Sequence, residues 1–402
     1  MLTFFSKKVS ISFIYRLNFK IIDEFMNNKS VLIIAGETSG DIHGANLIRE
    51  MKNLIPDLQF YGIGGERMEK EGTELFYNVN QMSLIGVTEI LSHIPFIYKV
   101  INRMVSIVEE KNPNLIILID YPGFNIRLGG RLKKLGKRIF YYISPQVWAW
   151  GERRIKKIAK FTDKMAVILP FEEKIYRSAG IDVSFTGHPL LDITKTDVSR
   201  EEFFRISSLS EDKMTIGLLP GSRIQEVKTL LPEMLKAIKI IKGRLDDIQG
   251  IVSISPMIAK TIYKEVIGKN FLISAVENFN YPIMKHSDLL IVASGTATLE
   301  AAIFETPMII VYKVSPVTYF FAKLFVKIPN IGLVNIIAQE KIVPEIIQRR
   351  SLADDIADEM ERIIKYPEIM NKMREDLKKT KKALGNTGAS KRAAEMALKL
   401  LD

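Results

Sequence analysis

Short apolar runs recur along the whole chain and alternate with longer polar-apolar stretches of helical period. Each run is short enough to be one buried strand, and helical patterns fill most of the intervals between the runs. Such alternation is typical of α/β proteins with parallel sheets. The predicted strands are Val31–Ala35, Leu115–Asp120, Arg138–Ile143, Met165–Leu169, Thr215–Leu219, Ile251–Ser255, Leu289–Ala293 and Met308–Tyr312.

The alternating pattern restarts once, after the segment FTGHP that ends at Pro189. A polar stretch follows before a fresh strand begins at Thr215, so we predict two domains. The Lys-rich tail has helical period, and we expect its helices to pack back towards the N-terminal domain. Met26 is a plausible alternative start of the chain. The predicted parts are an extension (1–29), an N-terminal domain (30–189), a linker region (190–213), a C-terminal domain (214–365) and the tail (366–402).

Composition narrows the class of protein. The 402 residues are 47% hydrophobic, enough for two cores, and no apolar run reaches the roughly 18 residues of a spanning helix. The chain has no Cys, which excludes disulfides, thiolate nucleophiles and Cys-ligated metals and favours a reducing compartment. The net charge of +11 suits a polyanion, an anionic membrane surface or a phosphorylated substrate.

The segment ASGTATLE ends a predicted strand and opens a helix at once. A helix beginning after Ser294, Gly295 and Thr296 presents unpaired backbone N–H groups beside hydroxyls, and glycine lets an anion approach closely. This arrangement predicts a diphosphate site, with Glu300 accepting hydrogen bonds from ribose hydroxyls. A plain helix N-cap, with Glu300 facing the helix dipole, is the alternative.

A second turn of the same kind, LPGSR, also follows a strand and opens a helix. Its Arg223 can offer a bidentate guanidinium fork to a phosphate. The alternative for Arg223 is a surface ion pair with Glu226. Two anion-binding turns on one sheet support each other.

The first domain has polar strand ends as well. AGETSGDIHGA follows its first strand and carries Glu37, Ser39, Asp41 and His43, which indicates substrate handling. IDYPGFN ends another strand with Asp120, a candidate general base. For either aspartate the alternative is a helix N-cap.

Other stretches indicate sugar or lipid contacts. YYISPQVWAW holds both tryptophans and Gln146, and aromatic faces beside polar groups suit sugars and acyl chains. Residues 84–105 are more apolar than a solvated helix needs and carry Lys99 and Arg103, as a lipid surface would. Residues 306–339 contain no acid. Burial in a core or a subunit interface is the alternative for both apolar stretches.

Several common sites are excluded by their missing motifs. The chain has no P-loop motif, no third glycine after GIGG for a dinucleotide fingerprint, and no GxSxG. Its four histidines are too far apart in the sequence for zinc-ligand spacing.

Taken together, these motifs resemble the lipid-A-disaccharide synthase family, whose members are inverting glycosyltransferases of the GT-B class. The segments that carry the resemblance are AGETSGDIHGA, GIGGERM, IDYPGFN, YYISPQVWAW, LPFE, FTGHPLLD, LPGSR, ASGTATLEAA and NIIAQEKIVPEIIQ. Their order covers Val31 to about Gln348. The resemblance implies two Rossmann-like domains whose parallel sheets face a central cleft.

It also implies a reaction, in which UDP-2,3-diacylglucosamine and 2,3-diacylglucosamine 1-phosphate give the β-1′,6-linked disaccharide and UDP, with no metal or cofactor. The implied catalytic residues are Asp120, Asp41, Glu37 and Arg223. The implied UDP-binding residues are Arg223, Ser294, Gly295, Thr296, Ala297, Glu300, Asn335 and Gln339, and those for sugar or acyl groups are Ser39, His43 and Gln146.

One departure from the family pattern concerns the catalytic base. Some members carry a second acid where this chain has Gly123, so Asp120 is the first choice here, with Asp41 and Glu37 in reserve. The family resemblance further implies a homodimer that exchanges C-terminal domains, in which Asn335 and Gln339 complete the partner's nucleotide site. It places the protein in the cytoplasm, peripherally on the inner membrane of a Gram-negative bacterium.

Rival interpretations share part of these features. A UDP-N-acetylglucosamine 2-epimerase or a transferase of wall-lipid synthesis would have the same fold and UDP site. The segments AGETSGD and SPQVWAW favour the lipid A enzyme. A basic membrane or nucleic-acid binder would explain the charge but not the polar strand ends, so no nucleic-acid partner is expected.

Overall fold

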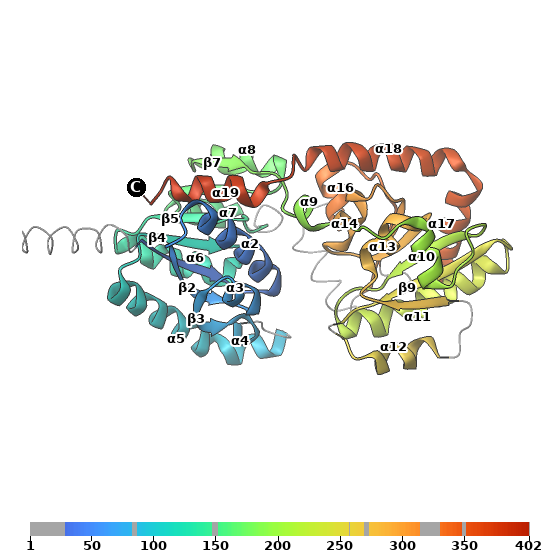
Figure 1. Cartoon of the computed structure of the whole chain (residues 1–402), viewed down its shortest axis with the longest axis horizontal. Coiled ribbons are helices and arrows are strands. Elements are labelled where there is room, and N and C mark those ends of the chain that lie inside the picture. The colour runs from blue at the N-terminus through green and yellow to red at the C-terminus, as the bar shows by residue number, and fades with distance from the viewer. Residues whose placement is uncertain are drawn as a thin grey trace, which may run out of the picture. The chain divides into compact units, whose positions relative to one another are not determined.

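The computed structural model describes residues 29–82, 87–146, 152–256, 258–268, 273–313, 330–347 and 351–401. The chain divides into two compact units (Figure 1). Unit 1 consists of residues 1–187 and 388–402, and unit 2 of residues 188–387.

Unit 1 is built around a parallel seven-stranded sheet with the order β3-β2-β1-β4-β5-β6-β7. Apart from Ser30, its central strands β1 and β4 are apolar on both faces and buried, as expected where helices cover both sides. Its elements are β1 (Ser30–Ala35), α2 (Thr38–Leu54), β2 (Gln59–Gly64), α3 (Glu66–Lys70), β3 (Thr73–Asn78), α4 (Val79–Met82), α5 (Val87–Lys111), β4 (Leu115–Ile119), α6 (Pro122–Lys134), β5 (Ile139–Tyr142), α7 (Glu152–Ala159), β6 (Lys164–Val167), α8 (Pro170–Ser178), β7 (Val183–Phe185) and α19 (Ala389–Leu398).

Two apolar cores lie in unit 1. One contains Met104 of α5, Leu128 of α6, Ile158 of α7 and Tyr176 of α8. The other contains residues of α2 and α19, which pack side by side. The chain end therefore returns to cover the first unit (Figure 1).

Unit 2 has a parallel six-stranded sheet with the order β10-β9-β8-β11-β12-β13. Its core joins β8, β9, β11 and β12 to α11 and α17. Its elements are α9 (Leu190–Ile193), α10 (Arg200–Ser207), β8 (Met214–Leu219), α11 (Ile224–Lys242), β9 (Ile248–Ile254), α12 (Lys260–Ile267), β10 (Ile273–Glu277), α13 (Asn280–His286), β11 (Leu289–Ala293), α14 (Ala297–Ile303), β12 (Met308–Tyr312), α16 (Leu333–Ala338), β13 (Glu345–Ile347), α17 (Leu352–Lys365) and α18 (Pro367–Ala383).

The unit boundaries differ from the predicted domain boundaries. Residues 190–213 were expected to be a linker, but their helix α10 buries Phe203 and Phe204 in the core of unit 2. In the tail, α18 packs on α14 and α16 of unit 2, and α19 alone packs on unit 1. Apolar side chains on α10 and α18 explain the difference, because each must be buried against a neighbour.

Every predicted strand is present, and the strands that the sequence pattern missed are β2, β3, β7, β10 and β13. Four of these are the edge strands of the two sheets. Edge strands are short or half-exposed, so their apolar pattern is weak. The fifth, β2, has the sequence QFYGIG, in which two glycines interrupt the apolar run.

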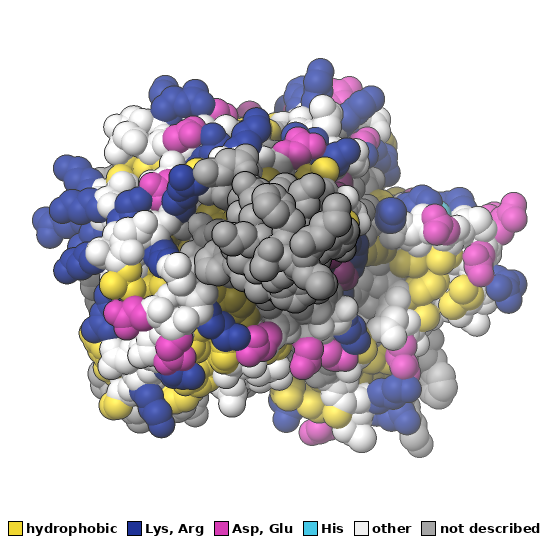
Figure 2. Space-filling view, turned by 60° about the vertical axis from the view of Figure 1, so that its left-hand side comes forward, with side chains coloured by type: hydrophobic (Ala, Val, Ile, Leu, Met, Phe, Trp, Pro, Cys, Tyr) yellow, Lys and Arg dark blue, Asp and Glu magenta, His cyan; other side chains and the backbone are white. Residues whose placement is uncertain are grey.

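No helix in the described ranges is long and apolar enough to cross a membrane. On the face drawn in Figure 2, Lys and Arg side chains are dispersed among acidic and apolar ones instead of gathering in one stripe. A stripe would be expected of a protein that follows a nucleic-acid backbone.

Candidate active site

The strand order of unit 1 reverses between β1 and β4, and ligands of open parallel sheets bind at the carboxyl ends of such a pair. Ala35 pairs with Ile119 at these ends. Glu37 follows β1 and Asp120 follows β4, so two predicted acids meet at the reversal point. Gly36 is required there, because a Cβ at Gly36 would lie 2.1 Å from the ring of Tyr121.

Asp120 as a whole residue is half-buried, and its carboxyl group is buried beside Glu37. Burial, and after it the negative charge of Glu37, raises the pKa of Asp120 from 3.8 to about 7. The backbone N–H of Tyr121 has the opposite effect, because its hydrogen bond favours the ionised form. A carboxylate with a pKa near 7 suits a general base at neutral pH. Helix α6 has Tyr121 as its N-cap with no side-chain cap bond, so Asp120 does not cap it.

Asp41 lies on α2 but is turned away from this pair. Its carboxylate accepts hydrogen bonds from the backbone N–H groups of Gly65 (2.7 Å), Arg67 (3.2 Å) and Met68 (3.1 Å), and the side chain is 4% exposed. Asp41 therefore accepts from the backbone N–H groups at the N-terminus of α3, which is a capping role like the predicted alternative. This corrects its assignment as a reserve base.

We expect Asp41→Asn to lower the free energy of unfolding by about 1–3 kcal/mol, because an amide cannot accept from all three N–H groups. Turnover per folded molecule should stay within about 3-fold of wild type. Urea denaturation and initial rates measure the two quantities, with exposed Asp57→Asn as the control. Unchanged stability together with a large loss of turnover would return Asp41 to the catalytic set.

The predicted sugar-binding residues lie at the same edge of the sheet. Ser39 is exposed in the first turn of α2, and His43 follows it one turn later. Burial lowers the pKa of His43 to about 4, so its imidazole is neutral, and its Nδ1 has no hydrogen-bond partner among the described residues. Gln146 is exposed after β5. Both tryptophans lie outside the described residues.

In unit 2 the strand order reverses between β8 and β11, and a cavity of about 290 Å³ lies there. All the predicted nucleotide residues of the LPGSR and SGTATLE turns line it. They are Arg223, Ser294, Gly295, Thr296, Ala297 and Glu300. Residues separated by a long stretch of chain thus meet at one point, because Leu219 pairs with Val292.

The SGTATLE turn offers backbone donors to this cavity. The N–H groups of Gly295, Thr296 and Ala297 have no acceptor among the described residues. Gly295 has a φ of +155°, and a Cβ placed on it would meet nothing within 4 Å, so its backbone borders open space. Thr298 supports the turn by donating its hydroxyl to the carbonyl of Gly295 (2.8 Å).

The LPGSR turn is occupied by a carboxylate of its own chain. Glu226 Oε2 accepts from the backbone N–H groups of Ser222 (3.1 Å) and Arg223 (3.2 Å). Glu226 Oε1 lies 3.4 Å from Nη1 of Arg223, whose side chain is 82% exposed. The predicted alternative ion pair is therefore present. Two N–H groups of the turn are occupied, and the exposed guanidinium can still meet an anion.

Glu300 closes another side of the cavity. Tyr281 donates its hydroxyl to Glu300 Oε1 (3.1 Å), and burial raises the pKa of Glu300 despite this bond. The hydroxyl fixes the orientation of the carboxylate, which suits it to accept from vicinal hydroxyls of a ribose. Sequence reasoning missed Tyr281.

Ser253 on β9 is another residue that the motifs did not reveal. Its hydroxyl lines the cavity, is 4% exposed, and has no hydrogen-bond partner among the described residues. A buried hydroxyl in this condition is a candidate ligand contact. A serine within the apolar run from Ile251 to Ile254 was the signal that could have found it.

The role predicted for Asn335 is corrected by its surroundings. Asn335 is fully buried, and its amide nitrogen donates to Val343 O (2.9 Å) and Glu345 Oε1 (2.8 Å). Its oxygen accepts from the N–H groups of Ile342 and Val343. The amide nitrogen and oxygen of Asn335 thus make all their hydrogen bonds within unit 2. Gln339 is exposed and does not line the cavity described above.

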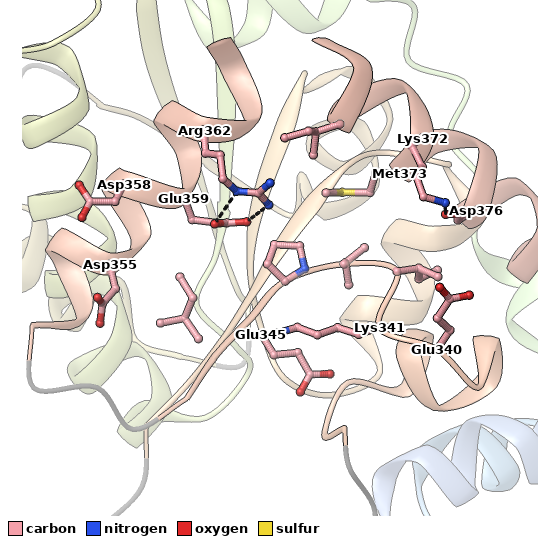
Figure 3. A pocket seen from close by; sticks show the side chains of 15 residues that line it. Glu340, Lys341, Glu345, Asp355, Asp358, Glu359, Arg362, Lys372, Met373 and Asp376 are labelled. Atoms are coloured by element: carbon pink, nitrogen blue, oxygen red, sulfur yellow. Dashed lines mark hydrogen bonds and ion pairs between the residues drawn. The ribbon is translucent and has the colours of Figure 1, made fainter. Parts of the chain in front are cut away.

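A larger cavity of about 800 Å³ lies between the loop before β13 and helices α17 and α18. Figure 3 shows Arg362 paired with Glu359 on α17 and Lys372 paired with Asp376 on α18. Acidic side chains outnumber basic ones in the lining, which is unfavourable for a diphosphate, and the cavity lies beside the edge strand β13, away from the reversal point of the sheet. It is therefore not the candidate site.

In the described part of the apolar segment 84–105, some apolar side chains are exposed and others are packed on the core. Ile94 and Tyr98 are 43% and 45% exposed, one turn apart on α5 beside Lys99. Phe96 and Ile97 pack on the core of unit 1 instead. Residues 83–86 and the side chains of 87–93 lie outside the description, as do 314–329 of the acid-free stretch.

Comparison with known proteins shows the family of the chain. A family model described as lipid-A-disaccharide synthetase matches residues 31–400. The chain is 43% identical over 378 residues to the lipid-A-disaccharide synthase of Syntrophus aciditrophicus, covering 94% of this chain and 99% of that one. Identity to the enzyme of Geobacter metallireducens is 39% over 375 residues, covering 93% and 98%.

Solved structures resemble the chain in fold. UDP-GlcNAc 2-epimerase from Neisseria meningitidis, bound to UDP-GlcNAc, matches with a TM-score of 0.59 at 14% identity, covering 92% of this chain and 100% of that one. A spinosyn rhamnosyltransferase matches with a TM-score of 0.55 at 8% identity, covering 92% and 99%. They confirm the predicted α/β fold with two Rossmann-like domains of the GT-B kind.

Proposed function

The chain belongs to the lipid-A-disaccharide synthetase family and is a glycosyltransferase of lipid A biosynthesis, and on this premise we propose its substrates and mechanism. The donor is UDP-2,3-diacylglucosamine and the acceptor is 2,3-diacylglucosamine 1-phosphate. The products are the β-1′,6-linked lipid A disaccharide 1-phosphate and UDP. The observation that carries the proposal is the gathering of six predicted nucleotide residues around one cavity of unit 2.

The transfer inverts the anomeric centre. Asp120 accepts the proton of the acceptor 6-hydroxyl, whose oxygen attacks the anomeric carbon of the donor as the bond to the diphosphate breaks. The electron pair of that bond goes to the leaving UDP. The guanidinium of Arg223 and the N–H groups of the SGTATLE turn stabilise this charge. Glu300 holds the ribose, and Ser39, His43 and Gln146 contact the sugars.

The proposed reaction needs no metal. Arg223 and the backbone donors supply positive charge at the cavity instead.

The decisive assay uses the purified full-length chain with both lipid substrates. We expect UDP release that depends on the acceptor, and a disaccharide product identified by mass spectrometry. Interconversion of UDP-N-acetylglucosamine and its 2-epimer, without acceptor-dependent UDP release, would favour the epimerase interpretation and overturn the proposal.

We propose that the protein acts peripherally on the cytoplasmic face of the inner membrane of a Gram-negative bacterium, because both substrates carry acyl chains. Exposed Ile94 and Tyr98 on α5, beside Lys99, support a contact with lipid. The proposal retains a homodimer with exchanged C-terminal parts, without a role for Asn335.

The double substitution Ile94→Ser and Tyr98→Ser should weaken binding to vesicles of phosphatidylethanolamine and phosphatidylglycerol by about 10-fold or more, because two apolar side chains lose their insertion. Vesicle sedimentation measures the bound fraction. The matched control is Leu135→Ser, an apolar side chain of unit 1 that is 38% exposed. Equal binding by the double variant and wild type would place the lipid contact elsewhere.

A further inference from the structure

The backbone at Asp120 has an unusual conformation for residues with side chains. Asp120 and Tyr121 both have positive φ, 40° and 48°, in the left-handed region that favours glycine. Two consecutive residues of this kind at a strand end require other contacts to hold them. The reversal point of unit 1 is therefore a strained site.

Two buried side chains hold the carbonyl oxygen of Asp120. Asn125 on α6 donates to it from Nδ2 (2.8 Å), and Tyr141 on β5 donates from its hydroxyl (2.7 Å). Both residues are 0% exposed. Asn125 Nδ2 also donates to the carbonyl of Ile119 (3.1 Å), so it spans the end of β4 and the strained residue.

The N–H group of Asp120 is held as well. It donates to the carbonyl of Ile143 (3.1 Å), which itself has a φ of 61°. A β-branched residue in that region is a rare outlier, which marks Ile143, just after β5, as a third strained residue. The backbone of Asp120 is thus bonded on both sides, and its carboxyl group is the part left to face a ligand.

These bonds to the backbone of Asp120 are not part of the regular hydrogen bonding of β4 or α6. β4 ends at Ile119, before the strained residues, and α6 begins at Pro122. The left-handed pair instead places the ring of Tyr121 over Gly36, where its hydroxyl donates to Met82 O (3.0 Å). It brings the Asp120 carboxyl beside Glu37 of the other strand end.

We infer that Asn125 and Tyr141 are positioning residues for the catalytic base, holding the carbonyl of Asp120 so that its carboxylate stays buried and directed at the acceptor hydroxyl. This inference rests on the proposed role of Asp120. Neither residue touches substrate in this scheme. Their effect reaches the reaction through the backbone of Asp120 alone.

The titratable groups around Asp120 determine how its pKa would change if its backbone carbonyl were no longer held. Glu37, Tyr121, Tyr141 and Tyr176 act electrostatically on Asp120 or respond to it. Burial raises the pKa of each of these tyrosines, so all are neutral near pH 7. Loosening the carbonyl would let the carboxyl move towards water, and its pKa would fall towards 3.8.

The test compares Tyr141→Phe and Asn125→Leu with wild type in the full-length enzyme. Tyr141→Phe removes one donor to the Asp120 carbonyl with little change in volume, and Asn125→Leu removes the other while keeping a similarly branched shape. We expect kcat to fall about 10-fold in each, with the KM for the UDP donor within about 2-fold. The acidic limb of the pH profile of kcat/KM should move to lower pH than in the wild type. Tyr61→Phe, a buried tyrosine of the same sheet, is the control.

The pH profile separates positioning from stability. If folded variants, checked by circular dichroism, keep the wild-type kcat and the wild-type acidic limb while Asp120→Asn is inactive, the inference is wrong and the proposed base stands. If Asp120→Asn itself turns over normally, the proposed base is wrong and the inference falls with it. A loss of kcat with an unmoved acidic limb would also overturn it, since folding defects alone leave the limb in place.

Discussion

Asp120→Asn is expected to lower kcat by about 100-fold or more while leaving UDP affinity within about 2-fold of wild type. The amide keeps the shape of the carboxyl and tolerates the left-handed φ of 40° at this position. It cannot accept a proton from the acceptor hydroxyl. Initial rates measure turnover, and calorimetric titration with UDP tests the nucleotide site separately.

The pH dependence of the wild-type enzyme belongs to the same prediction. A base must be ionised to act, and burial with the charge of Glu37 raises the pKa of Asp120 to about 7. We therefore expect kcat/KM to rise with pH through about 7 and then to level off. Glu37→Gln should move this limb to lower pH, because it removes a negative charge beside Asp120.

Stability should change in the opposite direction from activity. The raised pKa means that the folded protein holds a proton that the unfolded chain releases near pH 3.8. The stability from this group is present below pH 3.8 and is lost as pH rises through about 7. Urea denaturation should thus show that Asp120→Asn becomes more stable than wild type over this range.

The assignment of the base has a separate test. Near-normal turnover of Asp120→Asn, together with a large loss of turnover in Glu37→Gln, would identify Glu37 as the base instead.

Arg223→Ala is expected to lower kcat/KM by about 100-fold or more, because one donor to a developing negative charge is typically worth a few kcal/mol. Glu226 occupies the backbone N–H groups of Ser222 and Arg223 in the LPGSR turn. The exposed guanidinium is the charged group of this turn that can meet the diphosphate. UDP should also bind more weakly, in contrast to Asp120→Asn.

A matched control for Arg223 exists in the same unit. Arg205 is 75% exposed and pairs with Glu202 three residues earlier, as Arg223 pairs with Glu226 three residues later, but Arg205 does not line the cavity. Arg205→Ala should therefore leave turnover and UDP affinity within about 2-fold of wild type. Arg223→Lys should recover part of the loss, since lysine keeps the charge without the fork. Turnover of Arg223→Ala within about 3-fold of wild type would contradict the phosphate role.

The central strands and the nucleotide turns were predictable from local sequence. A buried parallel strand is a short apolar run, and the turn after it carries the polar residues, so Arg223, Gly295 and Glu300 were recognisable within a few neighbours. That these turns line one cavity follows from the pairing of β8 with β11. Strand order itself is set by long-range packing.

The roles of other residues depended on contacts with distant parts of the chain. Asp41 accepts from Gly65, Arg67 and Met68, and Asn335 is bound by the loop before β13, so neither is available to a substrate. No local window contains both partners of such bonds. Side-chain periodicity, likewise, could not show that Phe96 and Ile97 face the core while Ile94 and Tyr98 face outward.

Local pattern therefore determined the α/β class, the central strands and the chemistry of the candidate nucleotide turns, because backbone hydrogen bonding and strand burial act over a few residues. The tertiary structure decided which acids face a ligand and what their pKa values are. Burial and the approach of Glu37 raise the pKa of Asp120, and Asn125 and Tyr141 hold its backbone. These effects arise only when separate strands meet at one edge of a sheet, since electrostatic and packing energies depend on distance in space.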